Sequence, residues 1–247
     1  MAQWTPRGFG SAAAWREHII TRGCYDRQEN ERIFNKWFRT APKIAFRRAD
    51  AIYDLRSKTL CDVGCAYGAN LPFTKSGSYG LEVNNDYVKF ARAVDLDVHQ
   101  RDVIADDLGD LPPVDVVWCS ALIEHVDSPH ILLRKLHLLL KPGGLLFLFA
   151  PILPLISSLR YLPKYGSNFT SHLHDDHVSA FTPRTLRFTC ERAGFQTREI
   201  SALYRPPFSI LNRILMLRAT CMYVGRAEVG WEYPKLSSRR VGRDQHA

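Results

Sequence analysis

Three acidic side chains stand at or just after the ends of short apolar runs. Asp62 lies within the run 59–63, Glu82 ends the run 79–82, and Asp102 follows the run 97–100. Glu82 follows Asp62 by about twenty residues, a spacing suited to accepting hydrogen bonds from both hydroxyls of a ribose. A carboxylate at Asp102 can only accept hydrogen bonds, which matches the exocyclic amine of adenine, unless it caps a turn instead. The spacing therefore predicts a nucleoside site.

The turn after Asp62 has small residues where a backbone must bend closely against a ligand. Gly64 and Gly68 can adopt angles closed to residues with a Cβ, and Ala66 lies between them. We expect a helix to begin near Gly68, with N–H groups and a positive dipole end that suit a carboxylate or a phosphate. Asp62 would repel a pyrophosphate but could pair with an ammonium group. The D-x-G-x-A-x-G pattern thus favours S-adenosylmethionine over NAD, with a strand-turn-helix without ligand as the alternative.

Regular alternation of strands and helices would position these residues. Alternating βαβα elements with short apolar strands predict a parallel sheet covered on both faces, with its ligand at the carboxyl ends of the strands. Asp62, Glu82, Asp102 and the segment 120–125 all fall at such ends. We expect strands near 59–63, 79–82, 97–100, 114–119 and 144–150 with helices between them, then a helix 183–193, a strand from 195, a helix 210–217 and a strand 221–225.

Several segments in order resemble one family. Residues 58–195 resemble class I S-adenosylmethionine-dependent methyltransferases, in the branch that includes ubiquinone-biosynthesis O-methyltransferases and the type 11 and 23 methyltransferase domains. The resemblance implies a Rossmann-like α/β fold with a seven-stranded, mostly parallel sheet and helices on both faces. It also implies S-adenosyl-L-methionine as donor and S-adenosyl-L-homocysteine as product, but no acceptor. The matching segments are 59–68, 79–82, 114–120, 123–126, 139–144 and 177–183.

The implied cofactor contacts follow the cofactor from end to end. Asp62 and Gly64 would approach the amino-acid end, Glu82 the ribose and Asp102 the adenine amine. Apolar walls on the adenine would come from Leu81 and Val103. The full predicted set is Asp62, Gly64, Ala66, Gly68, Glu82, Val83, Asp102, Val103 and Ser120.

Two histidines are candidates for catalysis. Methyl transfer needs an acceptor aligned behind the methyl carbon and, for a hydroxyl, a base, for which histidine is suited near neutral pH. His125 follows Glu124, and His177 begins a His-Val-Ser-Ala-Phe-Thr-Pro segment. A structural hydrogen bond is the alternative for His177, and helix capping or packing the alternative for His125. We expect transfer to oxygen.

Some relatives carry a Glu-x-x-Glu-His run and a later histidine that resemble a divalent-metal site. Here Ala121 stands where the first acid would be, ahead of Glu124 and His125. Mg²⁺ would lose one of its few carboxylate ligands, so we expect no metal, although Asp175 or Asp176 could substitute.

The chain divides into a catalytic domain with additions. We expect a helical extension over residues 1–55, with a helical pattern from Ala12 to Leu55, and the methyltransferase domain over 56–230. We expect residues 231–247 to form a basic, flexible tail. In the extension, Trp37 and Phe38 would either cover the active site and touch the acceptor or pack on the sheet.

The segment 151–183 is long for a connection, and loops of that size are usually functional. It holds Tyr161, Tyr165, Asn168, Phe169, His172 and His174, which could line an acceptor pocket. Its apolar first part fits either an apolar acceptor, such as a prenylated quinone or a lipid-linked sugar, or a buried amphipathic helix. We therefore expect a small-molecule acceptor.

Composition agrees with one enzyme domain in the cytoplasm. The chain has 247 residues, 46% of them apolar, and a net charge of +8. Its six cysteines lack metal-ligand spacing, which favours reduced thiols. The N-terminus has no apolar core typical of a signal peptide, and the most apolar stretch, 145–156, is too short to span a membrane and contains prolines. Nothing in the sequence indicates the oligomeric state.

Two other functions remain open. An RNA methyltransferase would use the basic surface, but the chain has no recognisable RNA-binding module and no Asn-Pro-Pro-aromatic motif after the fourth strand. A non-catalytic module with a nucleoside pocket would explain the absence of an acid at Ala121.

Overall fold

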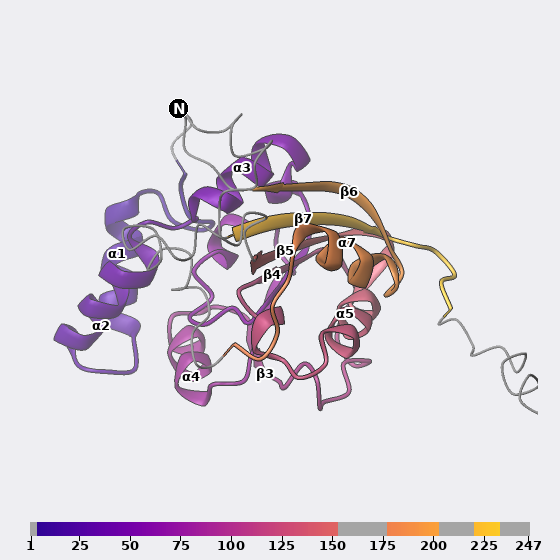
Figure 1. The fold of residues 1–247 in the computed structure, drawn as a ribbon. Coiled ribbons are helices and arrows are strands. Elements are labelled where there is room, and N and C mark those ends of the chain that lie inside the picture. Colours follow the sequence, from indigo (N-terminus) through magenta and orange to yellow (C-terminus); the bar gives the residue numbers. More distant parts are fainter. Residues whose placement is uncertain (1–3, 153–176, 203–219, 233–247) are drawn as a thin grey trace, which may run out of the picture.

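A seven-stranded sheet forms the centre of the computed structural model, which describes residues 4–152, 177–202 and 220–232 (Figure 1). The strand order is β3-β2-β1-β4-β5-β7-β6, and β7 runs antiparallel to both of its neighbours. The predicted Rossmann-like α/β fold is therefore confirmed. The strands are β1 (Leu60–Val63), β2 (Tyr79–Glu82), β3 (Val98–Gln100), β4 (Val114–Ser120), β5 (Leu140–Pro151), β6 (Phe195–Ala202) and β7 (Thr220–Ala227).

The central strands are apolar on both faces because helices cover both. On one face, Val117 packs in a core with residues of α5 (Pro129–Leu138) and α7 (Pro183–Glu191). On the other face, Val116 and Trp118 pack with residues of α3 (Ile44–Tyr53). Figure 1 shows α3 on one side of the sheet and α5 and α7 on the other. Such two-sided burial explains the near-continuous apolar run of β4.

The pairing of the strands brings their carboxyl ends to one edge. Val63 at the end of β1 pairs with Cys119 of β4, and Glu82 at the end of β2 pairs with Gln100 of β3. Ser120 is level with Phe149 of β5. The segments that follow β1, β2, β3 and β4 therefore meet along this edge, as the sequence predicted.

The N-terminal part is helical, as predicted, but in several short pieces. These are α1 (Ala12–Arg22), α2 (Arg27–Ile33), the π-helix η1 (Phe34–Phe38), α3 and the 3₁₀ turn η2 (Leu55–Ser57). Phe38 is buried against Phe90 of α4 (Asn85–Ala93). Trp37 contacts Tyr67 and Tyr87. Both side chains thus pack on α4 and the loop after β1, rather than on the sheet itself.

The prediction of a helix beginning near Gly68 is wrong. Residues 66–70 form turns, followed by the three-residue 3₁₀ helix η3 (Leu71–Phe73). Gly68 has a φ of 71°, and Pro72 has no N–H to bond the Gly68 carbonyl, so an α-helix cannot start there. The loop after β1 therefore offers a ligand no α-helix dipole.

The prediction of a helix between β3 and β4 is also wrong, since residues 101–113 form turns. The Asp102 and Asp106 carboxylates accept backbone N–H groups within this segment. Aspartate side chains that bond nearby backbone in this way compete with helix formation.

Some predictions lie outside the described residues. These are the acceptor residues Tyr161, Tyr165, Asn168, Phe169, His172 and His174, the acids Asp175 and Asp176, the helix 210–217 and residues 233–247 of the tail. Among the helices of the described residues, none has the length and apolar character needed to cross a membrane.

Candidate functional site

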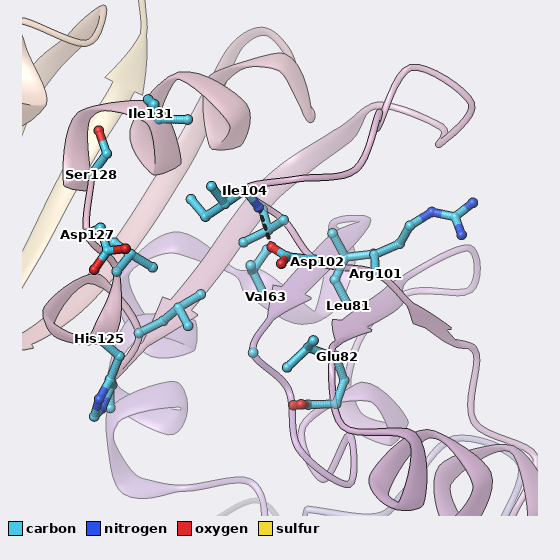
Figure 2. Close-up of a pocket in the computed structure, with 16 residues that line it drawn as sticks. Val63, Leu81, Glu82, Arg101, Asp102, Ile104, His125, Asp127, Ser128 and Ile131 are labelled. Carbon is cyan, nitrogen blue, oxygen red and sulfur yellow. Dashed lines mark hydrogen bonds between the residues drawn. The ribbon is translucent and has the colours of Figure 1, made fainter. Parts of the chain in front are cut away.

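A pocket of about 690 Å³ opens where β1, β2 and β4 end (Figure 2). Its lining includes five of the predicted cofactor residues and one predicted catalytic residue. Glu82 and Asp102 come from one wall, and His125 comes from the opposite wall. The predicted residues in the lining are Gly64, Glu82, Val83, Asp102, Val103 and His125.

Glu82 is a buried carboxylate that holds two loops together. Its Oε2 accepts the backbone N–H of Ala66 at 2.8 Å, and its Oε1 accepts that of Asn84 at 2.9 Å. The side chain is 8% exposed. Each carboxylate oxygen has a second lone pair, so the group can still accept hydroxyls from a ligand. Glu82 is therefore fixed in position before any ligand binds.

Asp62 lies beneath the loop rather than in the pocket lining. It is 4% exposed, and the Nδ2 of Asn70 donates to its Oδ2 at 3.1 Å. Burial raises the pKa of Asp62 to about 7, although the Asn70 hydrogen bond opposes the shift and the nearby charge of Glu82 adds to it. A cation close to this carboxyl would favour its ionised form.

The small residues of the loop have different roles. Gly64 has a φ of 69° and lines the pocket, where an added Cβ would come 3.6 Å from the Leu122 side chain. Gly68 faces the core, where a Cβ would come 3.1 Å from Leu71 Cδ1. Ala66 has a φ of 49° and is placed by its bond to Glu82. Only Gly64 of the three lines the pocket.

Asp102 caps a turn and also lines the pocket. Its Oδ1 accepts the backbone N–H groups of Ile104 at 2.9 Å and Ala105 at 3.2 Å, and Figure 2 shows the first of these bonds. The side chain is exposed to the pocket, so its other oxygen can accept from a ligand. Asp102 can thus cap the turn and also accept a hydrogen bond from a ligand, because capping orients the carboxylate.

The end of β4 contributes differently from the prediction. Ser120 is exposed but is not in the pocket lining, whereas the next residue, Ala121, lines the pocket with a φ of 53°. The Ala121 N–H bonds the Phe149 carbonyl at 3.0 Å. Sequence reasoning also missed Leu122, Ile104 and Ile131 as apolar lining. Leu122 and Ile104 were signalled only by their positions shortly after predicted strand ends, and Ile131, within α5, had no signal.

The predicted histidines lie side by side next to the pocket. Val178 and Ser179 donate backbone N–H groups to the carbonyl of Glu124 at 2.9 and 3.1 Å. These bonds hold the segment that begins at His177 against the 3₁₀ helix η4 (Ile123–His125). The His125 and His177 rings pack edge to face with centroids 4.7 Å apart. A nitrogen base can therefore be offered to a substrate at this end of the pocket.

Glu124 adds a carboxylate to the two imidazoles. One ligand atom from each of Glu124, His125 and His177 lies within 4.8 Å of the others, and Glu124 is buried. This spacing could hold a divalent metal ion. One carboxylate and two imidazoles suit a transition ion such as Zn²⁺ or Mn²⁺ better than Mg²⁺, which prefers oxygen ligands.

Comparison with known proteins places the chain in a family. Residues 27–200 match the family described as a methyltransferase domain. The chain is 27% identical to the ubiquinone biosynthesis O-methyltransferase of Aeromonas salmonicida, over 72% of this chain and 84% of that protein. It is 29% identical to the enzyme of the same name from Neisseria meningitidis serogroup C, over 70% and 82%.

Solved structures share the fold at lower identity. A methyltransferase from Archaeoglobus fulgidus aligns with a TM-score of 0.54 and 20% identity, over 78% of this chain and 98% of that one. The [4+2]-cyclase SpnF aligns with the same TM-score and 16% identity, over 75% and 82%, so the fold alone does not fix the chemistry. Because the family match spans more than half of the chain, the protein belongs to the class I S-adenosylmethionine-dependent methyltransferase family.

Proposed function

We propose that the protein transfers the methyl group of S-adenosylmethionine to a hydroxyl oxygen of a small-molecule acceptor. The observation that carries this proposal is the histidine pair, His125 and His177, beside the pocket. In the reaction the carbon–sulfur bond of the sulfonium breaks and a carbon–oxygen bond forms. The acceptor proton passes to an imidazole, and S-adenosylhomocysteine leaves.

The donor would lie along the pocket edge with each end near a matching group. Glu82 accepts the ribose hydroxyls, and Asp102 accepts the adenine amine between the apolar side chains of Val83 and Val103. The amino-acid end lies over Gly64, where the ammonium group is close enough to Asp62 to favour its ionised form. Asp102 and His125 line opposite sides of the pocket, which supports this direction of binding.

His177 is the proposed base, and His125 orients it. The backbone bonds of Val178 and Ser179 to Glu124 fix the segment that carries His177, and the His125 ring packs against its ring. A base must be held within hydrogen-bond reach of the acceptor proton. This anchoring supplies the rigidity that such a role needs.

The acceptor class rests on the relatives. Two relatives at 27% and 29% identity are named ubiquinone biosynthesis O-methyltransferases. We propose a phenolic or similar hydroxyl, on a small molecule with apolar substituents, as the acceptor of this protein. The proposed setting is the cytoplasm, and the proposed acceptor is not a nucleic acid.

The test separates donor binding from transfer. His177→Ala should lower turnover about 100-fold or more, the range for loss of a positioned base, and leave S-adenosylmethionine affinity unchanged. Val178→Ala is the matched control, because Val178 is an exposed neighbour in the same segment. Release of S-adenosylhomocysteine with catechols that carry or lack a prenyl chain gives the readout. Equal turnover in the two variants would refute the role of His177.

A second use of the same cluster is metal binding, favoured by the spacing of Glu124, His125 and His177. A bound divalent ion would lower the pKa of an acceptor hydroxyl that contacts it. The two uses predict different responses to chelation. If His177 acts as the base without a metal ion, as we propose, turnover should be unchanged after dialysis against EDTA.

Cobalt absorption gives a readout that does not depend on activity. A saturable d–d band with Co²⁺ that is lost in Glu124→Gln, together with turnover that is lost on chelation and restored by Zn²⁺ or Mn²⁺, would replace the metal-free proposal. His99→Ala is a matched control, since it removes a histidine that lies on β3 near Asp97 and does not belong to the Glu124, His125 and His177 cluster.

A further inference from the structure

A second cleft lies at the end of the sheet opposite the cofactor pocket. It has a volume of about 930 Å³ and is lined by residues around the starts of β1, β4 and β5, with Arg198 of β6 and Arg226 of β7. β4 has seven residues between the two sites. At about 3.3 Å per residue the sites are about 20 Å apart, so a ligand here would not touch the donor.

The cleft is rich in positive charge. Four of its lining side chains are cationic, and Asp115 is the one carboxylate among the described lining residues. A second carboxylate, Glu199, accepts the hydroxyl of Tyr53 at 3.0 Å beside the wall. Cations still outnumber carboxylates by two to one. The four cationic residues are Lys58, Lys141, Arg198 and Arg226.

Three of the cations are held in place by the protein. Lys58 Nζ donates to the carbonyls of Tyr53 at 2.6 Å and Asp54 at 3.1 Å. Arg226 Nε donates to the Gly143 carbonyl at 3.1 Å, which leaves its two terminal nitrogens for other partners. Gly143 makes this possible, because a Cβ there would come 3.1 Å from Arg226 Nη2. The Arg226 guanidinium is therefore oriented in advance.

Lys141 and Asp115 neutralise each other. Lys141 Nζ lies 2.8 Å from Asp115 Oδ1. Burial alone would raise the Asp115 pKa, but hydrogen bonds from Lys141 and Thr59 outweigh burial and lower this pKa to about 2. Because Asp115 stays ionised and paired with Lys141, the charges of Arg198 and Arg226 remain for a ligand.

Arg198 lies at an irregularity of β6. The pairing with β7 shifts between Thr197, which is opposite Gly225, and Glu199, which is opposite Val224. The residue between them is Arg198, and bulges of this kind redirect a side chain. Within the described part of the chain, the Arg198 guanidinium donates no hydrogen bond, and the residue is exposed.

We propose that this cleft binds a small polyanion that carries phosphate groups, such as pyrophosphate or a nucleoside polyphosphate. Arginine guanidinium groups pair with phosphate through two parallel hydrogen bonds, and two of them stand here beside a fixed lysine. A cleft of this volume has the size of a small-ligand site. Tyr53 is the one aromatic residue in the described lining, whereas single-stranded RNA sites use several for stacking.

Calorimetry of the full-length protein with inorganic pyrophosphate tests the proposal. We expect saturable binding that weakens with added salt. Arg198→Gln and Arg226→Gln should each weaken it about tenfold, as expected for loss of a hydrogen bond to a charged group. Arg39→Gln is the matched control, because Arg39 is exposed, lies outside the cleft and also removes one positive charge. Circular dichroism confirms that each variant is folded.

Each outcome decides the question. Absence of saturable binding to folded wild type, or equal affinity in all three variants, would overturn the proposal. Binding of a single-stranded RNA that pyrophosphate does not displace, and that depends on Arg198 and Arg226, would overturn it in favour of a nucleic-acid surface. Because the donor pocket is a separate site, failure here leaves the proposed methyl transfer untouched, and S-adenosylmethionine binding measured on the same samples distinguishes the two.

Discussion

The Glu82 carboxylate accepts the backbone N–H of Ala66 at 2.8 Å, across the gap between β2 and the loop after β1. Ala66 has a positive φ of 49° there, a conformation unfavourable for a residue with a Cβ. The bond therefore stabilises a strained loop as well as placing an acceptor at the edge of the pocket proposed for the donor. Experiments can separate the structural role of Glu82 from its proposed ligand-binding role.

Replacing Glu82 should lower stability even without a ligand. Glu82→Ala leaves the partly buried Ala66 N–H without its acceptor, which costs about 1 to 3 kcal/mol, whereas the N–H of the exposed Asn84 can bond water instead. Glu82→Gln keeps one amide oxygen and should cost less. Urea unfolding of the free protein measures both. Wild-type stability in Glu82→Ala would contradict the structural role.

A test of the proposed ribose contact requires a change in the ligand as well as a change in the side chain. We expect S-adenosylhomocysteine to bind wild type more tightly than its 2′-deoxy analogue, by about 1.5 to 3 kcal/mol for a hydrogen bond to a carboxylate. In Glu82→Gln this difference should shrink. A difference that is the same in both proteins would show that Glu82 does not contact the ribose.

Asp62 should couple stability to pH. Its pKa is raised in the folded protein to about 7 from an ordinary value of 3.8. The folded state therefore binds the proton more tightly, so the contribution of Asp62 to stability is full below about pH 4 and is lost as pH rises towards 7. Relative to Asp62→Asn, wild type should lose about 1.4 kcal/mol per unit of pKa shift over this range. Parallel pH curves for the two proteins would contradict this.

Binding of the donor should also release a proton from Asp62. At pH 6 the free protein holds Asp62 largely protonated, and an ammonium group nearby should expel that proton. Calorimetry of S-adenosylmethionine at pH 6, in buffers of different ionisation enthalpy, should show proton release in wild type. Asp62→Asn should release less. Equal release would place the ammonium group elsewhere.

The two loop glycines should respond differently to alanine. Both have positive φ, which costs a residue with a Cβ about 1 to 2 kcal/mol. Gly68→Ala also places a Cβ 3.1 Å from Leu71 Cδ1 and 3.3 Å from Val98 Cγ2, which adds a packing penalty of about 1 to 3 kcal/mol. Gly64→Ala meets nothing closer than 3.6 Å. Thermal unfolding should thus rank Gly68→Ala as the less stable variant.

Much of the fold followed from sequence because its signals are local. The strands at Leu60–Val63, Tyr79–Glu82 and Val114–Ser120 lie within one residue of the prediction, since short apolar runs between turns are distinctive. The helix expected at Gly68 failed because Pro72 lies within its first turns. The prediction of this helix relied on the glycine and did not take the proline into account.

The site was harder to predict because it depends on contacts distant in sequence. The role of Glu82 in holding Ala66 needs two strands in register, and the pairing of His125 with His177 needs backbone bonds between segments about fifty residues apart. Ser120 was predicted in place of Ala121 because the last residue of a strand does not show which side chain turns into the pocket. The second cleft has no sequence motif, since its four cationic residues come from four separate segments.

Calorimetric titration of the purified protein with S-adenosylmethionine and S-adenosylhomocysteine tests the central claim most directly. We predict saturable, micromolar binding of both that falls sharply in Asp102→Ala, which removes the proposed adenine acceptor, and that is unchanged in Arg39→Gln. The absence of binding to folded wild-type protein would contradict the assignment of this pocket to the methyl donor.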